Sequence, residues 1–427
     1  MAEQVETVIV GGSQAGLAMS YWLTQRGREH VILERGRIGE RWRSERWDSL
    51  TLLGPNWLNG LPGFDYEGDD PDGFLPRDGM VRRLEAYAAR YNAPMRCGVE
   101  VTSLQQKPGI TRYLLQTGSG ETLEAVNVVV ATGPYQKATV RPSSSTLPPD
   151  VVQLSSTSYR NPAQLPPGGV LVIGSASSGC QICEDLHKNG RPVFLSVGLC
   201  QRNLRRYRGK DSTWWNYHMG SFDLSPEIAG AYEARYGVPA QITGVGGGHD
   251  LDYRRFEAEG VTLLGHLRGI EDGMPQFAPD LAETIRLWDE SLANWKGHVD
   301  AYVEKAGIDA PPNDAPPLPG PEVRAAADPI LQLDLRALGI TSVIWANGFA
   351  YDFGWIKVPA FDGTGRPIHR CGVTAFPGLY FLGLKFLSKV KSPFIFGVGD
   401  DAAYLAEQID AEAHAGQVGA RGGGSWP

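Results

Sequence analysis

The chain has 427 residues, of which 42% are hydrophobic and 53 are glycine, a composition that suits a globular protein with two cores of ordinary domain size. Its formal net charge of -8 argues against nucleic acid as a partner, because nucleic-acid-binding surfaces carry a clustered basic excess. The five cysteines are too few for a disulfide scaffold, and no segment has the pattern of a signal peptide or a transmembrane helix. We therefore expect a cytoplasmic protein without a transmembrane segment, and the sequence leaves both a monomer and a homodimer open.

The first chemical signal is the stretch VIVGGSQAGL at residues 8–17. An apolar strand ends at Val10, a turn of small residues follows, and a helix is predicted from Gln14, which is the layout of a phosphate-binding helix N-terminus. At the middle position of the G-x-G-x-x-G fingerprint stands Ser13, whose hydroxyl can donate to a phosphate oxygen, so it tightens the site rather than breaking it. The predicted dinucleotide-binding residues are Gly11, Gly12, Ser13, Gln14, Ala15 and Gly16.

A second copy of this strand, turn and helix unit lies at residues 170–186, VLVIGSASSGCQICEDL. Its middle fingerprint position holds Ala176, which has no hydroxyl, so the neighbouring serines are expected to supply the side-chain donors. One such turn alone is a weak signal, whereas two in the same context indicate two dinucleotide sites. The predicted residues of this turn are Gly174, Ser175, Ala176, Ser177, Ser178 and Gly179.

The strands that follow the two turns end differently. The first, HVILERG, ends in Glu34, which is placed to accept the hydroxyl hydrogens of an adenosine ribose. The second, RPVFLSVG, has no carboxylate and precedes a basic segment in which Arg202 and Arg205 are expected to bind a ribose 2'-phosphate. The first turn therefore suits FAD and the second NADPH, with a solvated basic face as the alternative for any single residue of the segment, which contains Arg202, Arg205, Arg206, Arg208 and Lys210.

Proline-rich loops suggest how the two units are connected. The loops RPSSSTLPPD and NPAQLPPGG precede the second unit, and a proline-rich stretch at residues 309–321 follows a helical segment. The sequence thus predicts an α/β fold of two Rossmann-like domains, with the NADPH domain inserted in the FAD domain. The expected ranges are 1–162 for the first part of the FAD domain, 163–325 for the NADPH domain with a helical insertion, and 326–427 for the return segment and C-terminal helix.

Three further segments carry a family resemblance: VVVATGP at 128–134, IWANGFAYDF at 344–353 and PGLYFLGL at 377–384. With the two turns, they make the chain similar to the single-component flavin-containing monooxygenases, and most similar to bacterial CzcO-like flavoproteins related to plant YUCCA-type enzymes. The resemblance implies that NADPH reduces the flavin and that O2 adds at flavin C4a, giving a hydroperoxide that passes one oxygen to a small organic substrate. It leaves open whether nitrogen, sulfur or a carbonyl group is oxygenated.

The resemblance also implies site residues. Asn56, in the tryptophan-rich segment at residues 41–64, matches an asparagine that lies beside the flavin in this family, so we predict that it is catalytic. Its amide can donate and accept hydrogen bonds in a dry cleft, and the alternative is that it caps the turn after Pro55. The remaining predicted cofactor-binding residues are Arg35, Arg41, Trp42, Val101, Ala131, Thr132, Gly133, Asn347, Gly348 and Gly383.

Two positions depart from the family pattern, and two other functions stay open. Ser155 stands where related bacterial members usually have histidine. The resemblance implies that residues 128–134 and 344–353 are two hinge segments through which the chain passes between the domains, and Asn347 makes the second of them more polar. Cys180 and Cys183 form a C-x-x-C pair, which would suit a disulfide reductase or thiol oxidase, although buried cysteines on the second helix are favoured. A redox sensor that binds both nucleotides without turnover is the third possibility. The histidines show no metal-ligand spacing, so no metal site is expected.

Overall fold

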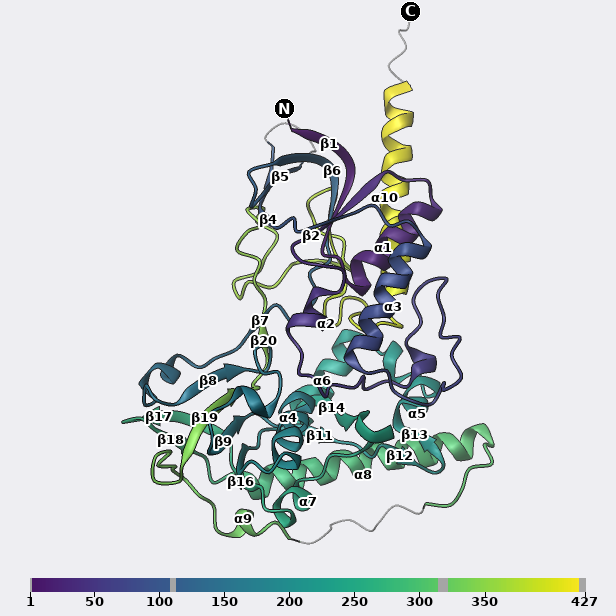
Figure 1. Ribbon diagram of the computed structural model, residues 1–427. Helices are drawn as coiled ribbons and strands as arrows, with labels where there is room; N and C mark the ends of the chain where they lie inside the picture. The colour runs from purple at the N-terminus through teal and green to yellow at the C-terminus, as the bar shows by residue number, and fades with distance from the viewer. Residues whose placement is uncertain (1, 108–112, 314–321, 422–427) are drawn as a thin grey trace, which may run out of the picture.

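The computed structural model describes residues 2–107, 113–313 and 322–421, which form two parallel-sheet units placed end to end (Figure 1). The first sheet has five parallel strands in the order β3, β2, β1, β6 and β21, and an antiparallel extension through β5 and β4. Its central strands are apolar and buried on both faces, as parallel strands between helical layers require. The strand bounds are β1 Glu3–Val10, β2 His30–Glu34, β3 Met95–Cys97, β4 Val101–Gln106, β5 Tyr113–Thr117, β6 Thr122–Val130 and β21 Leu379–Phe381.

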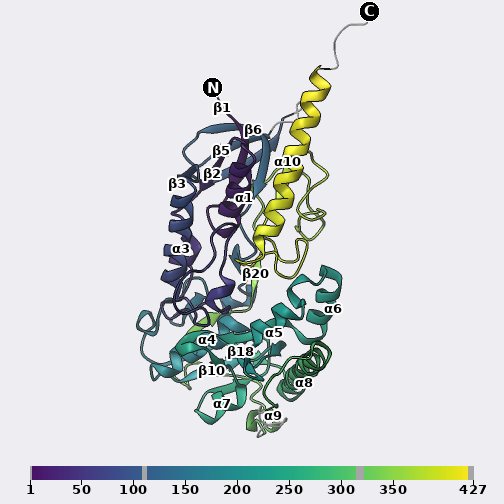
Figure 2. The same ribbon diagram turned by 90° about the vertical axis from the view of Figure 1, so that its right-hand side faces the viewer.

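Helices from both ends of the chain cover this sheet. Helix α1 (Gln14–Gln25) begins at the residue expected from the sequence and packs against α10 (Val398–Arg421). Figure 2 shows α10, in yellow, running alongside α1, with α3 (Arg77–Arg90) on the other side of α1. Residues near the two chain ends therefore build one domain, which is the arrangement expected for a domain interrupted by an insertion.

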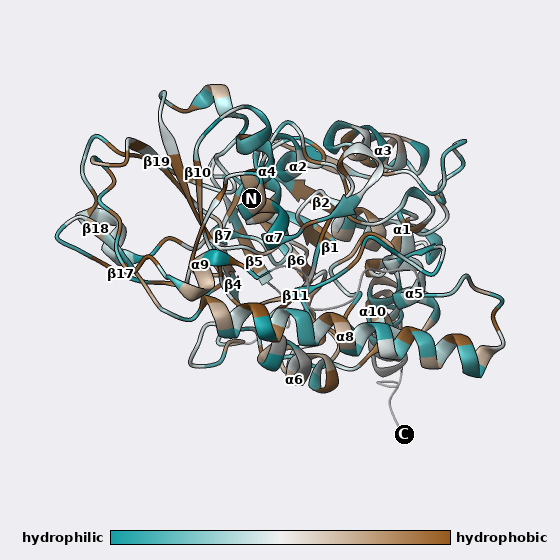
Figure 3. Cartoon of the chain, turned by 90° about the horizontal axis from the view of Figure 1, so that it is seen from below, coloured by the Kyte–Doolittle hydropathy of each residue, from teal (hydrophilic) through white to brown (hydrophobic). Residues whose placement is uncertain are grey.

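The second sheet has five parallel strands in the order β16, β10, β9, β19 and β8. Alternate residues of β9 enter different cores, with Val170 and Val172 on the side of α4 and α8, and Leu171 and Ile173 on the opposite side. Figure 3 shows these strands as hydrophobic (brown) and α8 as a mixture of both kinds of residue. The bounds are β8 Val152–Ser155, β9 Gly169–Ile173, β10 Val193–Ser196, β16 Thr262–Leu264, β19 Ile340–Trp345, α4 Ser177–Lys188, α7 Tyr253–Ala258 and α8 Leu281–Ala306.

Shorter elements surround the two sheets and connect them. Among them are the helices α2 Glu40–Ser44, α5 Ser212–His218, α6 Pro226–Tyr236 and α9 Arg324–Ala327. The short 3-10 helices are η1 Asn56–Leu58, η2 Pro142–Thr146, η3 Pro162–Gln164, η4 Ser221–Asp223 and η5 Val245–Gly247. The small strands are β7 Lys137–Ala138, β11 Cys200–Arg202, β12 Arg206–Tyr207, β13 Lys210–Asp211, β14 Val238–Thr243, β15 His249–Asp250, β17 Leu267–Glu271, β18 Met274–Phe277 and β20 Phe349–Ala350.

The α/β fold with an inserted second unit is confirmed. The second sheet also contains strands from outside the range 163–325 that was expected for this unit. Strand β8 precedes that range and β19 follows it, yet both pair within the second sheet. The chain passes between the units at the antiparallel pair β7 and β20, which lies between the two halves in Figure 1. The domain limits at residues 162 and 325 stay a prediction, and residues 314–321 of the proline-rich stretch lie outside the described residues.

Candidate functional site

The first glycine turn joins β1 to α1 and brings the backbone close to the end of β6. Gly11 has φ +116°, and a Cβ atom there would stand 2.6 Å from the carbonyl oxygen of Ala131. A Cβ atom at Gly16 would stand 1.9 Å from the carbonyl oxygen of Gly11. Both positions therefore require glycine. Since α1 begins after Ser13 without a side-chain cap, its first N–H groups are available to a phosphate group.

The second turn, which joins β9 to α4, has nearly the same backbone conformation and close contacts as the first. Gly174 has φ +106°, and a Cβ atom there would stand 2.5 Å from the carbonyl oxygen of Ala346. A Cβ atom at Gly179 would stand 1.8 Å from the carbonyl oxygen of Gly174. Helix α4 also begins without a side-chain cap, after Ala176. The chain thus contains two equivalent turns, each suited to the close approach of a pyrophosphate.

The serines of the two turns differ in what their hydroxyl groups contact. The Ser13 hydroxyl donates to Gln14 Oε1 at 2.6 Å, close to the N-terminus of α1. In contrast, Ser175 is buried and its Oγ accepts hydrogen bonds from the Tyr253 hydroxyl at 2.8 Å and from the Gly198 N–H at 3.0 Å. The Ser175 hydroxyl therefore belongs to the core below the second turn, which leaves Ser177 and Ser178 as the half-buried serines in the first turn of α4.

Glu34 lies at the carboxyl end of β2, next to the first turn. Its Oε2 accepts a hydrogen bond from the Gly12 N–H at 2.6 Å, and its Oε1 accepts one from the Gly36 N–H at 2.9 Å. A Cβ atom at Gly12 would stand 2.8 Å from the Glu34 Cβ, so glycine is needed there too. Each carboxylate oxygen keeps a second lone pair, which allows Glu34 to accept ribose hydroxyl groups as the sequence predicts.

Two other strand ends meet the first turn. Gly383, which follows β21, has φ +75°, and a Cβ atom there would stand 2.9 Å from the Ala15 Cβ. Thr132 and Gly133, which follow β6, accept hydrogen bonds from the Gln136 amide, both at 2.9 Å. The return segment and the first hinge segment are thereby held at the carboxyl edge of the first sheet, where doubly wound sheets bind ligands.

The second hinge segment follows β19. The Gly348 carbonyl accepts a hydrogen bond from the Thr139 N–H at 2.9 Å, which fastens this segment to the chain just after β7. Asn347 is half-buried, and its Oδ1 atom is buried without a hydrogen-bond partner among the described residues. An acceptor in this state, on the loop that touches the second glycine turn, fits a ligand that donates a hydrogen bond there.

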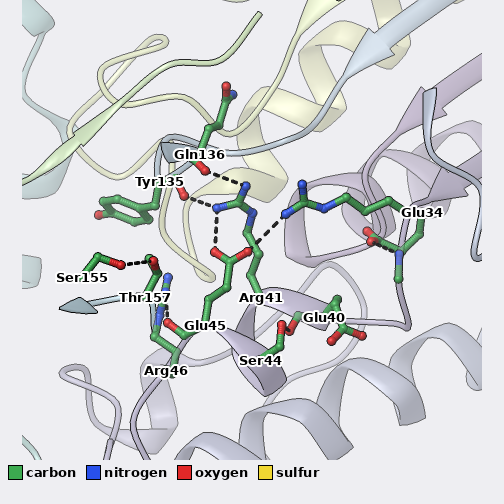
Figure 4. A network of polar contacts seen from close by, with 12 residues as sticks. Glu34, Glu40, Arg41, Ser44, Glu45, Arg46, Tyr135, Gln136, Ser155 and Thr157 are labelled. Carbon is green, nitrogen blue, oxygen red and sulfur yellow. Dashed lines mark hydrogen bonds and ion pairs between the residues drawn. The ribbon is translucent and has the colours of Figure 1, made fainter. Parts of the chain in front are cut away.

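The arginines expected near the FAD site form a network of polar contacts, which Figure 4 shows from close by. Glu45 accepts from Arg41 at 2.9 Å and from Arg35 at 3.1 Å, so one carboxylate compensates part of both charges. Arg41 also donates to the carbonyl oxygens of Tyr135 and Gln136, the latter at 3.0 Å. Arg41 therefore ties α2 to the first hinge segment, while Arg35 is half exposed and accessible to a ligand.

Trp42 and Val101 have mainly packing contacts. Trp42 is partly buried and packs against the hydrophobic cores of both units, and its indole Nε1 lies 3.5 Å from Gln14 Oε1. The guanidinium of Arg46 lies 5.8 Å from the centre of the Trp42 ring. Val101 is buried at the start of β4. Trp42 is thus placed between the two units, whereas Val101 contributes to the first core.

Ser155, one of the two positions expected to depart from the family pattern, ends β8. Its hydroxyl group shares hydrogen bonds with Thr157 Oγ1 at 2.7 Å and with Ser158 Oγ at 3.1 Å. These contacts close a local turn. Figure 4 shows Ser155 and Thr157 at the left of the view, with their hydrogen bond as a dashed line.

Asn56 opens the short helix η1 and is almost fully buried, with 4% of its surface exposed. Its side-chain amide donates to the Asp70 carbonyl at 2.8 Å, and its backbone N–H donates to the Gly73 carbonyl at 2.8 Å. Its Oδ1 atom is buried and has no partner among the described residues. The side chain is therefore fixed in place and retains one unsatisfied acceptor, which is more than capping of the turn after Pro55 would require.

Trp57, the residue after Asn56, belongs to a group of aromatic side chains that come from three distant segments. The Trp57 ring contacts Tyr217 of α5 at a centroid distance of 5.4 Å, and Tyr217 contacts Phe396, just before α10, at 6.3 Å. Neither Tyr217 nor Phe396 lies in a recognisable sequence motif. No motif could have identified them, because Tyr217 reaches Trp57, and Phe396 reaches Tyr217, only when the two units pack together.

The two arginines expected to hold a 2'-phosphate already have carboxylate partners. Arg202 pairs with Asp252 at 2.7 Å and with Asp289, and Arg205 pairs with Asp211 at 2.7 Å. Both side chains are buried. Binding of a phosphate would require these ion pairs to open, so the assignment stays a prediction that the observed contacts do not favour.

Cys180 and Cys183 lie on α4 and are both fully buried. The Cys180 thiol donates to the Ser175 carbonyl at 3.0 Å, and burial raises the pKa of both thiols above the ordinary value. A redox dithiol needs an accessible sulfur with a lowered pKa, so these contacts support the interpretation that both are core residues. Within the described ranges, no three His, Cys, Asp or Glu side chains come together to hold a metal ion, and none of the described helices has the length and apolar character needed to cross a bilayer.

Comparisons with known proteins agree with this geometry. Residues 8–204 match a family described as pyridine nucleotide-disulphide oxidoreductase. The chain is 32% identical to an uncharacterized CzcO-like oxidoreductase from Geobacillus kaustophilus over 96% of this chain and 99% of the relative, and 29% identical to the indole-3-pyruvate monooxygenase YUCCA1 of Oryza sativa over 44% of this chain and 47% of that protein. A flavin-containing monooxygenase from Stenotrophomonas maltophilia has a similar fold, with a TM-score of 0.63 at 18% identity over 96% of this chain and 99% of that one. The chain therefore belongs to the FAD- and NADPH-dependent family of single-component flavin monooxygenases that includes the CzcO-like oxidoreductases.

Proposed function

We propose that the protein is an NADPH-dependent monooxygenase that inserts one oxygen atom from O2 into a small organic substrate. The first glycine turn would hold FAD and the second would hold NADPH. The bound flavin would supply hydride acceptance and the activation of O2 at its C4a carbon. The chain itself would hold the two nucleotides at fixed positions, exclude water, and present a hydrogen-bonding group where the oxygen is activated.

The proposal rests mainly on the environment of the Asn56 side chain. Its amide nitrogen is held by the Asp70 carbonyl, while its buried Oδ1 lacks a partner among the described residues. A neutral, preorganised acceptor in a site that excludes water can accept a hydrogen bond from the O–H group of a reactive oxygen species without becoming charged. The buried Cys180 and Cys183 offer no comparable support for a dithiol reaction.

The test compares Asn56→Leu with Asn59→Leu. Asn59 is also buried and its amide donates to the Gly54 and Pro55 carbonyls, but its side chain has no unsatisfied buried atom. We expect Asn56→Leu to keep FAD and to be reduced by NADPH in anaerobic stopped-flow experiments, yet to release hydrogen peroxide instead of oxygenated product from a panel of small sulfides, amines and ketones. Asn59→Leu should lose thermal stability while its peroxide yield per NADPH stays that of the wild type.

Three outcomes would contradict the proposed role of Asn56 or the proposed monooxygenase function. Full coupling of NADPH consumption to product in Asn56→Leu would show that Asn56 is not part of the oxygenating site. Loss of FAD together with stability in the same variant would make Asn56 structural. A purified protein whose flavin is bleached by NADPH without any turnover would instead support a redox sensor.

The cytoplasmic location and the homodimer are also proposals. Cell fractionation and light scattering on the purified holoenzyme would check them directly.

A further inference from the structure

The loop that carries Asn56 is held by a residue of the second unit. Residues 50–57 run antiparallel to residues 71–77, with the Leu52 N–H donating to the Leu75 carbonyl at 2.9 Å and the Arg77 N–H donating to the Leu50 carbonyl at 2.9 Å. We call residues 50–77 the Asn56 loop. It belongs to the first unit by sequence, but the second unit covers one side of it.

Arg205 reaches this loop from the second unit. Its Nη1 donates to the Leu53 carbonyl at 2.9 Å, and its guanidinium carbon lies 4.6 Å from the centre of the Phe74 ring. Leu53 lies three residues before Asn56, and Phe74 directly follows Gly73, whose carbonyl binds the Asn56 N–H. The Arg205 guanidinium therefore contacts both antiparallel segments of the Asn56 loop.

Every N–H group of this guanidinium has an acceptor. Nε donates to Asp211 Oδ2 at 2.7 Å, and Nη2 donates to Asp211 Oδ1 and to Thr213 Oγ1, the latter at 3.1 Å. The second hydrogen of Nη1 faces the Thr243 carbonyl at 3.5 Å. Since a guanidinium has five N–H donors, none is left for a phosphate. Arg205 is 1% exposed, and Asp211 compensates its charge at short range.

Two glycines of the second unit bring its backbone against the same loop. A Cβ atom at Gly244 would stand 2.2 Å from the Leu52 carbonyl oxygen, and one at Gly248 would stand 2.8 Å from Arg205 Cδ and 2.9 Å from the Phe74 ring. The backbone of Gly244 has an ordinary conformation, with φ -97° and ψ -3°. Close approach to the Asn56 loop, and not backbone conformation, therefore explains glycine at position 244.

We infer that Arg205 is a positioning residue for oxygen transfer, which fixes the Asn56 loop to the nucleotide unit that supplies the hydride. The inference rests on the proposed role of Asn56. This positioning role replaces the expected role of Arg205 as a ligand of the 2'-phosphate. The N–H groups of Arg205 are bound to the Asn56 loop and to buried acceptors of the second unit, so they do not face an open binding surface.

Two variants separate this role from general stability. Arg205→Met removes the tie to Leu53, and Gly244→Ala pushes the loop away while leaving the Arg205 and Asp211 pair intact. Their matched controls are Arg336→Met, which removes an exposed arginine paired with Asp150, and Gly230→Ala, a helical glycine with no heavy atom within 4 Å of the added Cβ.

Hydrogen exchange by mass spectrometry gives a readout that does not depend on turnover. In the holoenzyme, both variants should speed amide exchange in residues 50–57 by about tenfold or more, the factor expected for loss of one hydrogen bond from a charged donor. Exchange in the central strands of the second sheet should stay unchanged in Gly244→Ala, and both controls should behave as the wild type. Unchanged exchange in residues 50–57 of both variants would overturn the inference, whether or not the enzyme oxygenates a substrate.

Nucleotide preference and peroxide yield complete the test. We expect both variants to raise the peroxide released per NADPH while the ratio of the KM values for NADPH and NADH stays that of the wild type. A selective rise of the KM for NADPH in Arg205→Met would restore the phosphate role and refute the positioning role. Faster exchange of the loop with an unchanged peroxide yield would show that the loop is held by Arg205 but that its position does not control oxygen transfer.

Discussion

Alanine substitution at the last glycine of each turn should separate the two cofactors. Gly16 and Gly179 occupy equivalent places, with an added Cβ at 1.9 Å and 1.8 Å from the carbonyl oxygens of Gly11 and Gly174. We expect Gly16→Ala to impair FAD binding. Gly179→Ala should leave FAD bound and impair reduction by NADPH, because the second turn lies in the other sheet.

The size of the effect follows from the contact distances. To bring an added Cβ from 1.9 Å to an ordinary distance of at least 3.4 Å, α1 and its turn must move apart by about 1.5 Å, and overpacking of this kind costs about 1–3 kcal/mol. Alanine also favours a helix by about 1 kcal/mol over glycine, so the net loss of folding stability should be at most about 2 kcal/mol. Displaced N–H groups lose charge-assisted hydrogen bonds to the pyrophosphate, which predicts about 10- to 100-fold weaker binding of the affected nucleotide.

The assay measures FAD content by absorbance, FAD affinity by fluorescence quenching and the rate of flavin reduction by NADPH. Gly297→Ala is the control, because Gly297 lies within α8 and an added Cβ would have no heavy atom within 4 Å. It should stabilise the protein slightly and bind both nucleotides normally. Full FAD content and normal stability in Gly16→Ala, or the same defect in both turn variants, would refute the assignment of one nucleotide to each turn.

Three further changes test the other assignments. Glu34→Arg should give protein without FAD, because a cation would replace the acceptor held beside Gly12, and retention of FAD would contradict this. Cys180→Ala and Cys183→Ala should keep NADPH turnover per bound flavin and lose about 1–2 kcal/mol of stability from the small cavity, so abolished turnover would point to a dithiol reaction. Burial raises the pKa of the Asp401 carboxyl group, because the folded state favours its protonated form. The protonated carboxyl group therefore stabilises the fold relative to the ionised one, and this stabilisation is lost as the pH rises through the pKa of the folded state. Asp401→Asn should therefore raise the melting temperature more at pH 8 than at pH 4, and an equal change at both values would show that the carboxyl group is not ionised at a cost.

The sequence alone predicted the parts of this protein that depend on local backbone chemistry. Each glycine turn lies between an apolar strand and a helix, and the start of α1 at Gln14 follows from that local pattern. Gly11 and Gly174 are required by contacts with the end of a neighbouring strand, and Gly16 and Gly179 by contacts within the turn itself, as in any fold of this class. The insertion of one unit in the other could also be predicted, because proline-rich loops flank the second unit along the chain.

The tertiary structure decided what the charged and polar side chains do. Arg202 and Arg205 form a basic segment in sequence, but in the folded chain their charges are compensated by Asp252, Asp289 and Asp211, and no local pattern indicates such pairing. Partners separated by up to 87 residues along the chain meet only after the units have packed. A guanidinium can donate to a phosphate, a carboxylate or a carbonyl oxygen, so its role is decided by which of these acceptors the fold brings within about 3 Å of it.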